Sequence, residues 1–298
     1  MNAVGSEAAS SEAVSPGSNL ITPQDLAERL TRPGAVVLDA TWTYPGGPTP
    51  SIEGAIPGAF AIDIDAVSDP DTALPHMLPS PAAFEAFARA LGVDHDSDVI
   101  AYDRMGVVSA PRAWWMFRVM GCARVRVLDG GLPAWAESGG ALAGAPLTPP
   151  APTQGNFKAA FVDALYADRS DVQNAIDRGD VQILDVRAAD RFAGAAPEPR
   201  PGVRAGHMPG ARNAPWGRFV TPEGRVAGLY DLAAAFDRAG VSAEAPVITS
   251  CGSGVTACVA ALALAELGRD DWAVYDGSWA EWGARDDTVV VQGAEDAS

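Results

Sequence analysis

A cysteine flanked by glycines has the surroundings in this chain that best suit covalent chemistry. Cys251 follows an apolar run at residues 247–249 and precedes an Ala/Leu-rich segment that continues to Leu267. The glycines let the backbone curl so that successive N–H groups point at one spot and hold an anion. Such amides, with the dipole of the following helix, favour a thiolate over a thiol. The backbone predicted to form this cradle belongs to Gly252, Gly254, Val255 and Thr256.

Two other interpretations of Cys251 compete with that of a nucleophile. An ordinary buried cysteine beside a turn is common, since the free thiol behaves as a small apolar group. A strand, a glycine-rich loop and a helix follow one another here, and the loop is expected at the carboxyl end of a parallel strand. This order favours a functional cysteine instead. Cysteine phosphatases use a similar loop, but they need an arginine six residues after the nucleophile, where this chain has Ala257. Phosphatase chemistry is therefore disfavoured.

The elements that position Cys251 belong to a repeat, because two halves of the chain carry similar segments about 148 residues apart. The paired segments are Val36–Ala40 with Gln182–Val186, Ile52–Ala59 with Arg204–Ala211, Val99–Asp103 with Val247–Cys251, and Leu128–Trp135 with Tyr275–Trp282. Four matches in the same order indicate a duplication. Asp103 occupies in the first copy the position that Cys251 occupies in the second.

Each half alternates short β-branched runs with Ala/Leu-rich helical segments, which is typical of an α/β fold. We expect two tandem domains, each a parallel sheet flanked by helices, with residues 99–102 and 247–249 as buried central strands. Four prolines within residues 145–152 mark the boundary. The predicted division is a disordered tail at 1–18, a non-catalytic domain at 19–145, a Pro-rich linker at 146–160 and a catalytic domain at 161–298.

Composition excludes several classes of partner. The 298 residues include 48% hydrophobic ones and carry a formal net charge of −17, so nucleic acid and anionic membranes are poor partners. The longest apolar stretch, 255–264, is too short for a membrane span. The N-terminus lacks a secretory signal, and three cysteines are too few for a disulfide framework. A cytoplasmic protein is expected, without a metal or other cofactor, because no metal cluster or nucleotide motif occurs.

The stretch Cys251–Cys258 resembles the active-site loop of the rhodanese-like sulfurtransferases. Within that family it is similar to the 3-mercaptopyruvate sulfurtransferases more than to the thiosulfate sulfurtransferases. The resemblance extends over nearly the whole chain and includes Ser109–Arg118, Leu128–Gly131, Gly206–Gly210 and Tyr275–Trp279. It implies two rhodanese-like domains of which only the second is catalytic. The residues agree, because the Asp103 carboxylate cannot accept a sulfane sulfur.

The resemblance also implies roles for residues outside the loop. Arg191 and Arg200 would hold the carboxylate and keto oxygen of mercaptopyruvate, whereas composition alone suggests two solvated arginines. Asp65, His76 and Ser253 would form a proton relay, the simpler alternative being that His76 only orders the domain interface. Arg187 is expected to be structural, paired with a carboxylate or the loop backbone.

The implied reaction moves sulfur from 3-mercaptopyruvate to Cys251 as a persulfide and releases pyruvate. Cyanide, a small thiol or a reduced protein dithiol then removes the outer sulfur. Two alternatives remain at this stage. One is a thiosulfate:cyanide sulfurtransferase, which the neutral Gly252 and Ser253 disfavour, because relatives that use thiosulfate carry basic residues there. The other is a rhodanese-fold binding protein without activity.

Overall fold

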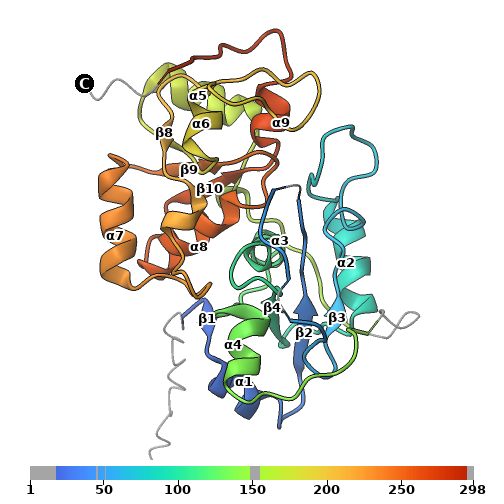
Figure 1. Ribbon diagram of the computed structural model, residues 1–298. Helices are drawn as coiled ribbons and strands as arrows, with labels where there is room; N and C mark the ends of the chain where they lie inside the picture. The colour runs from blue at the N-terminus through green and yellow to red at the C-terminus, as the bar shows by residue number, and fades with distance from the viewer. Residues whose placement is uncertain (1–17, 45, 51, 148–154, 294–298) are drawn as a thin grey trace, which may run out of the picture.

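Buried β-branched runs form the centres of two parallel sheets in the computed structural model, which describes residues 18–44, 46–50, 52–147 and 155–293 (Figure 1). The first sheet has the order β1-β5-β4-β2-β3. Its strands are β1 (Leu20–Ile21), β2 (Ala35–Asp39), β3 (Phe60–Ala61), β4 (Asp98–Tyr102) and β5 (Val125–Leu128). Every residue of the central strand β4 is buried, which explains its apolar run without alternation.

The second sheet repeats this topology with the order β6-β10-β9-β7-β8. Its strands are β6 (Tyr166–Ala167), β7 (Gln182–Asp185), β8 (Arg212–Asn213), β9 (Val247–Ser250) and β10 (Trp272–Tyr275). All pairings in both sheets are parallel. The fold is therefore α/β with two tandem domains, and the predicted central strands at 99–102 and 247–249 are confirmed as β4 and β9.

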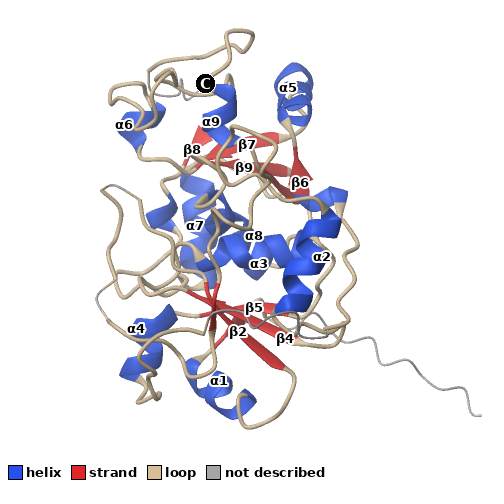
Figure 2. Ribbon diagram, turned by 90° about the vertical axis from the view of Figure 1, so that its right-hand side faces the viewer, coloured by secondary structure: helices blue, strands red, loops and turns tan. Residues whose placement is uncertain are grey.

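Helices cover both faces of each sheet. In the first half they are α1 (Pro23–Arg29), α2 (Pro81–Ala90), α3 (Ala110–Val119) and α4 (Gly131–Glu137). In the second half they are α5 (Arg169–Arg178), α6 (Ala189–Phe192), α7 (Leu229–Arg238), α8 (Ala257–Glu266) and α9 (Ser278–Trp282), with 3-10 turns η1 (Asp163–Leu165) and η2 (Trp216–Arg218). Figure 2 shows α3 and α8 in the layer between the two sheets.

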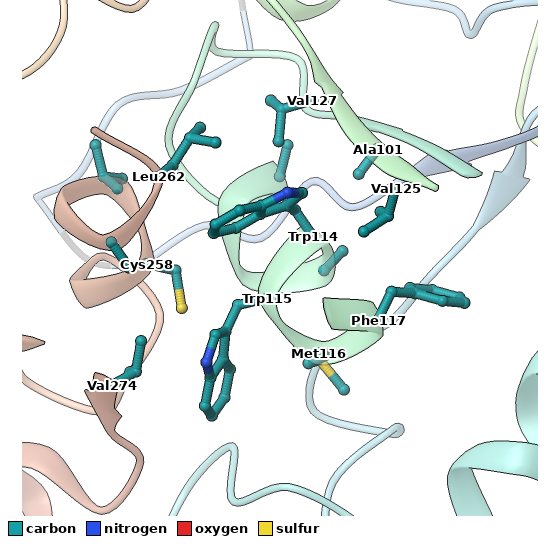
Figure 3. Packing of buried hydrophobic residues seen from close by; sticks show 14 of the residues in the cluster. Ala101, Trp114, Trp115, Met116, Phe117, Val125, Val127, Cys258, Leu262 and Val274 are labelled. Atoms are coloured by element: carbon teal, nitrogen blue, oxygen red, sulfur yellow. The ribbon is translucent and has the colours of Figure 1, made fainter. Parts of the chain in front are cut away.

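One hydrophobic core joins the two halves. Residues of α3 and β4 from the first half and of α8 and β10 from the second belong to the same buried cluster. Trp114 on α3 stacks on Trp272 of β10 with ring centroids 5.6 Å apart. Figure 3 shows this packing, with Cys258 and Leu262 of α8 beside the tryptophans of α3. Because the apolar faces of α3 and α8 bury each other, the domains are held in one arrangement around the loop of Cys251.

The described residues bear on some of the domain predictions. The predicted tail, apart from Ser18, and residues 148–154 of the predicted linker lie outside them. Cys122 and Cys258 are buried and free, as is Cys251. Within the described ranges no helix is long and apolar enough to cross a membrane.

Candidate active site

Cys251 lies at the carboxyl end of the central strand β9, and its side chain is buried with only 2% of the residue exposed. Its backbone is held by α9. The Cys251 N–H donates to the Ser278 hydroxyl at 3.1 Å, and its carbonyl accepts from the Trp279 N–H at 3.0 Å. The Gly252 carbonyl accepts from Ala280 at 2.9 Å. These bonds fix the start of the loop while leaving its amides uncommitted.

The loop after Cys251 presents an unbroken series of free amides. None of the N–H groups of residues 252–257 has a hydrogen-bond partner in the described part of the chain. Helix α8 starts at Ala257, so these groups lie at the positive end of its dipole. Gly254 has φ +78°, and a Cβ there would lie 2.8 Å from the Asp276 carbonyl oxygen. Only glycine fits this turn, which brings the amides together as a site for negative charge.

His76 reaches the loop from the first half of the chain. Its Nδ1 lies 3.2 Å from the backbone oxygen of Ser253, and its Nε2 lies 2.8 Å from a carboxylate oxygen of Asp65. His76 is 4% exposed, whereas the Asp65 side chain is 61% exposed. The ring of Trp42 meets His76 edge-on at 5.0 Å, and its N–H donates to Asp65 at 3.3 Å. His76 thus connects solvent-facing Asp65 to the cysteine loop.

Electrostatics at His76 favour its neutral form. Burial is the largest influence and lowers its pKa, while the Asp65 carboxylate acts in the opposite direction. The charges of Arg112 and Arg200 lower the pKa further. A neutral, buried imidazole beside a carboxylate can accept or deliver a proton within the site.

The three residues of the predicted relay are brought together, with one difference in detail. His76 binds the carbonyl of Ser253, not its hydroxyl. The Ser253 hydroxyl has no hydrogen-bond partner among the described residues. A carbonyl only accepts, so Nδ1 of His76 donates when it binds Ser253. A neutral ring then has no N–H left for the Asp65 carboxylate, and only the protonated ring donates to both oxygens at once.

Arg191 lies in α6, and Arg200 lies in the loop that follows this helix. Arg191 borders the cysteine loop, because a Cβ on Gly252 would lie 3.3 Å from its Nη2. Its guanidinium also binds Glu198, with Nη2 2.5 Å and Nε 3.3 Å from the carboxylate oxygens. Arg200 is half-buried and has no ion pair within the described residues. Its charge lowers the pKa of His76.

Arg187 is structural, as predicted. It is buried and donates to the Asp185 carboxylate at 2.6 Å, to Glu198 at 2.8 Å and to the Gly206 carbonyl at 2.8 Å. Its guanidinium stacks over Trp279 at 4.2 Å. Because Asp185 and Glu198 balance its charge, Arg187 supports the segment that carries Arg191 and Arg200.

Sequence reasoning missed two aromatic residues at the site, Trp42 and Tyr44. Burial raises the pKa of Tyr44, and the positive charge of Arg191 acts in the opposite direction. The two rings stack with centroids 5.4 Å apart. Both follow β2 at the carboxyl edge of the first sheet, and that position is the signal that could have identified them.

It also missed Arg112, a fully buried residue of α3. Its Nη1 donates to the Asp276 carboxylate at 2.7 Å, and both side chains are 0% exposed. The same guanidinium binds the carbonyls of His76 and Gly254. Arg112 therefore connects the His76 segment of the first half to the Gly254 carbonyl and the Asp276 carboxylate of the second half.

The chain matches proteins of known activity over most of its length. Residues 22–138 and 168–285 each match the family described as the rhodanese-like domain. The chain is 43% identical over 270 residues to the 3-mercaptopyruvate sulfurtransferase of Escherichia coli (strain K12), covering 89% of this chain and 95% of that protein. It is 36% identical to thiosulfate/3-mercaptopyruvate sulfurtransferase 1, mitochondrial, of Arabidopsis thaliana, covering 97% of this chain and 82% of that protein.

A solved structure agrees with the sequence matches. The crystal structure of SseA from Escherichia coli, described as a 3-mercaptopyruvate sulfotransferase, superposes with a TM-score of 0.77 at 39% identity. The match covers 89% of this chain and 100% of SseA. The shared fold, the two matched domains and the sequence identity over most of the chain lead to one assignment: this chain belongs to the rhodanese-like family and is a sulfurtransferase.

Proposed function

We propose that the protein transfers sulfur from 3-mercaptopyruvate to a thiol or cyanide acceptor through a persulfide on Cys251. The observation that carries this proposal is the series of unpaired amides at 252–257 around a buried cysteine. Such a loop stabilises negative charge on sulfur during attack and on the persulfide that follows. The arginines beside the loop supply positive charge for a carboxylate-bearing donor.

The first half-reaction forms the persulfide. The Cys251 thiolate attacks the sulfur of 3-mercaptopyruvate, forming the S–S bond, while the C–S bond of the donor breaks. The bonding electrons go to the carbon fragment, which leaves as the enolate of pyruvate and takes up a proton. In the second half-reaction an acceptor nucleophile attacks the outer sulfur and restores the Cys251 thiolate. The cycle is therefore ping-pong and needs no cofactor.

Donor binding is assigned to the arginines and the loop backbone. Arg191 and Arg200 would bind the carboxylate and keto oxygen, with Arg191 placed beside Gly252. The amides of Gly252, Gly254, Val255 and Thr256 would hold the sulfur charge.

A relay of Asp65, His76 and Ser253 is proposed to carry the proton to the departing enolate. The 2.8 Å contact between His76 and Asp65 supports it. The Ser253 end needs its hydroxyl to turn toward the substrate, since His76 already binds the Ser253 carbonyl.

Thiosulfate is the alternative donor. A dianionic donor benefits from cations directly after the nucleophile, and this chain has the neutral residues Gly252 and Ser253 there. The neutral loop supports mercaptopyruvate as the preferred donor.

A direct assay tests the proposal. Pyruvate and sulfide release would be measured with 3-mercaptopyruvate and a thiol, beside thiocyanate formation from thiosulfate and cyanide. We expect a larger kcat/KM for mercaptopyruvate and no turnover by Cys251→Ser. Equal kcat/KM values for the two donors, or no pyruvate release by the unmodified protein, would contradict the proposed substrate.

The cellular setting and domain limits are also proposals. Three free cysteines among the described residues support a reducing compartment such as the cytoplasm. The boundaries 19–145 and 161–298 remain our division of the chain. A small-molecule donor and a thiol, cyanide or reduced protein dithiol acceptor remain the proposed partners, with no nucleic acid or membrane.

A further inference from the structure

A buried carboxylate, Glu198, lies beside the donor-binding arginine. Its side chain is 4% exposed and lies between two guanidiniums. One oxygen is 2.8 Å from Nη1 of Arg187, and the other is 2.5 Å from Nη2 of Arg191. The Arg191 side chain remains 24% exposed. Arg191 therefore meets solvent and the cysteine loop while already paired with an anion.

The charges in this cluster cancel. Arg187 and Arg191 are balanced by Asp185 and Glu198, and all four side chains are linked by contacts of 2.5–2.8 Å. Arg200 has no ion pair within the described residues. Near the cysteine loop, Arg112 is neutralised by Asp276. Arg200 is thus the one uncompensated cation among the described arginines of this site.

We infer that Glu198 sets the charge of the donor that the site accepts, by neutralising Arg191 so that the pocket suits one negative charge. This rests on the proposed function. A monoanionic donor such as mercaptopyruvate satisfies Arg200 and still takes hydrogen bonds from Arg191. The second charge of a dianion such as thiosulfate would lie near the Glu198 carboxylate with no free cation to oppose it.

The geometry allows Glu198 to be neutralised without leaving a buried cation alone. Arg187 keeps its contacts with Asp185, Gly206 and Trp279 when Glu198 loses its charge. Glutamine has the shape of glutamate and retains one oxygen to accept from Arg187. Glu198→Gln should therefore free Arg191 with its surroundings maintained.

The experiment compares donors across two variants. kcat/KM would be measured for mercaptopyruvate and for thiosulfate, both with cyanide as acceptor, in the unmodified protein, Glu198→Gln and the charge-retaining control Glu198→Asp. We expect the thiosulfate-to-mercaptopyruvate ratio to rise at least about tenfold in Glu198→Gln and to change less than about threefold in Glu198→Asp. A ratio that stays constant, or that rises equally in both variants, overturns the inference.

A second measurement uses the unmodified protein and so does not depend on the folding of a variant. Pyruvate and sulfate, a monoanion and a dianion, would be compared as competitive inhibitors against mercaptopyruvate. Tighter inhibition by pyruvate supports the inference, and equal or tighter inhibition by sulfate contradicts it. The proposed function fails separately, if the unmodified protein releases no pyruvate from mercaptopyruvate.

Discussion

The two copies of the repeat use the same loop in opposite ways. In the first copy the Asp103 carboxylate is fully buried and accepts hydrogen bonds from four backbone N–H groups at 2.8–2.9 Å. The donors are Met105, Val108, Ser109 and Ala110. Burial raises the pKa of Asp103 and the amides act in the opposite direction. The first loop is thus an anion cradle filled permanently by its own side chain.

In the second copy the amides of residues 252–257 have no partner in the described residues, and the side chain in Asp103's place is the thiol of Cys251. The counterpart of Ala110 is Cys258, whose N–H donates to the Val255 carbonyl at 3.3 Å. The N–H groups of this loop are therefore available to a negative charge on sulfur, which appears only when the thiol ionises or carries a second sulfur. In the first copy this loop geometry binds a carboxylate. In the second copy the same geometry is available to bind charge on the sulfur of Cys251.

The contacts between domains are also nearly symmetric. Asp276 accepts the N–H of Leu78 at 2.7 Å, and Asp129 accepts the N–H of Val226 at 2.8 Å. Each domain thus holds a crossing segment of the other. Of these two contacts, only the one at Asp276 includes Arg112, which lies nine residues after Asp103. The equivalent position in the second half, nine residues after Cys251, is Ala260. The ion pair at Asp276 is therefore fully buried, whereas the one at Asp129 is partly exposed.

The largest expected effect is the loss of turnover in Cys251→Ser. A hydroxyl in the free cradle is a far weaker nucleophile than a thiolate and cannot carry a persulfide. Mass spectrometry after brief exposure to mercaptopyruvate should show one added sulfur on the peptide containing Cys251. Cys122→Ser and Cys258→Ser serve as controls and should retain most activity, because both thiols are buried in the core. Sulfur on Cys122, or turnover by Cys251→Ser, would refute the assignment.

His76→Ala should lower kcat by about 10²–10⁴-fold with a smaller change in KM, the range for loss of general acid–base catalysis. The reason is that His76 contacts both Asp65 and the cysteine loop. Steady-state kinetics with mercaptopyruvate would measure both constants. A rise in KM at constant kcat would show that His76 only helps to bind the donor.

Arg112→Met tests the asymmetric ion pair. Leaving Asp276 buried without its cation should destabilise the protein by about 3–5 kcal/mol, measured by denaturant unfolding. The other half supplies the matched control, since Arg225 lies 3.7 Å from Asp129 and is 36% exposed. Arg225→Met should cost less than about 1 kcal/mol. Equal losses would mean that the two interdomain contacts are energetically equivalent.

Asp103→Asn tests the filled cradle of the inactive copy. An amide nitrogen would replace one acceptor oxygen and face the backbone N–H donors, so we expect a loss of about 1–3 kcal/mol in unfolding free energy. Turnover at saturating mercaptopyruvate should stay within about twofold of the unmodified protein. Loss of activity without loss of stability would indicate that the first loop takes part in catalysis.

The repeat and the apolar runs were sufficient to predict the fold because they are local features. Residues 99–102 and 247–249 have no alternation, which identifies strands buried on both faces, and they are the central strands β4 and β9. The Ala/Leu-rich segment that continues to Leu267 forms α8 and its C-cap, and Gly268 follows directly with φ +77°. Local backbone preference and burial pattern carry this information.

The missed residues depend on contacts between distant segments. Arg112 lies 164 positions from Asp276, and the His76 ring reaches a carbonyl 177 positions away. Neither pairing follows from spacing, because both depend on how α3 and α8 dock. Likewise, no rule of composition predicts that Glu198 forms an ion pair with Arg191, or that His76 binds the carbonyl of Ser253 instead of its hydroxyl. His76 and Asp65 were identified from family resemblance, not from any pattern in the residues.

The smallest expected effect is on the pH dependence of stability. Burial lowers the pKa of His76 below the ordinary value of 6.5, so between these two values the unfolded chain binds a proton that the folded chain does not. Stability should therefore fall as pH falls below about 6.5, and His76→Asn should reduce that fall. The charged groups that act on His76 are Asp65, Arg112 and Arg200.

Denaturant unfolding from about pH 7.5 to about pH 5 measures this difference. The first copy has no ring in the corresponding contact with its loop, since Gly224 lies against Gly106 there. Keeping His76 neutral against the loop of Cys251 therefore costs stability at low pH, and Gly224 brings no such cost to the loop of Asp103. If the unmodified protein and His76→Asn lose stability in parallel below pH 6.5, the interface does not hold His76 in its neutral form.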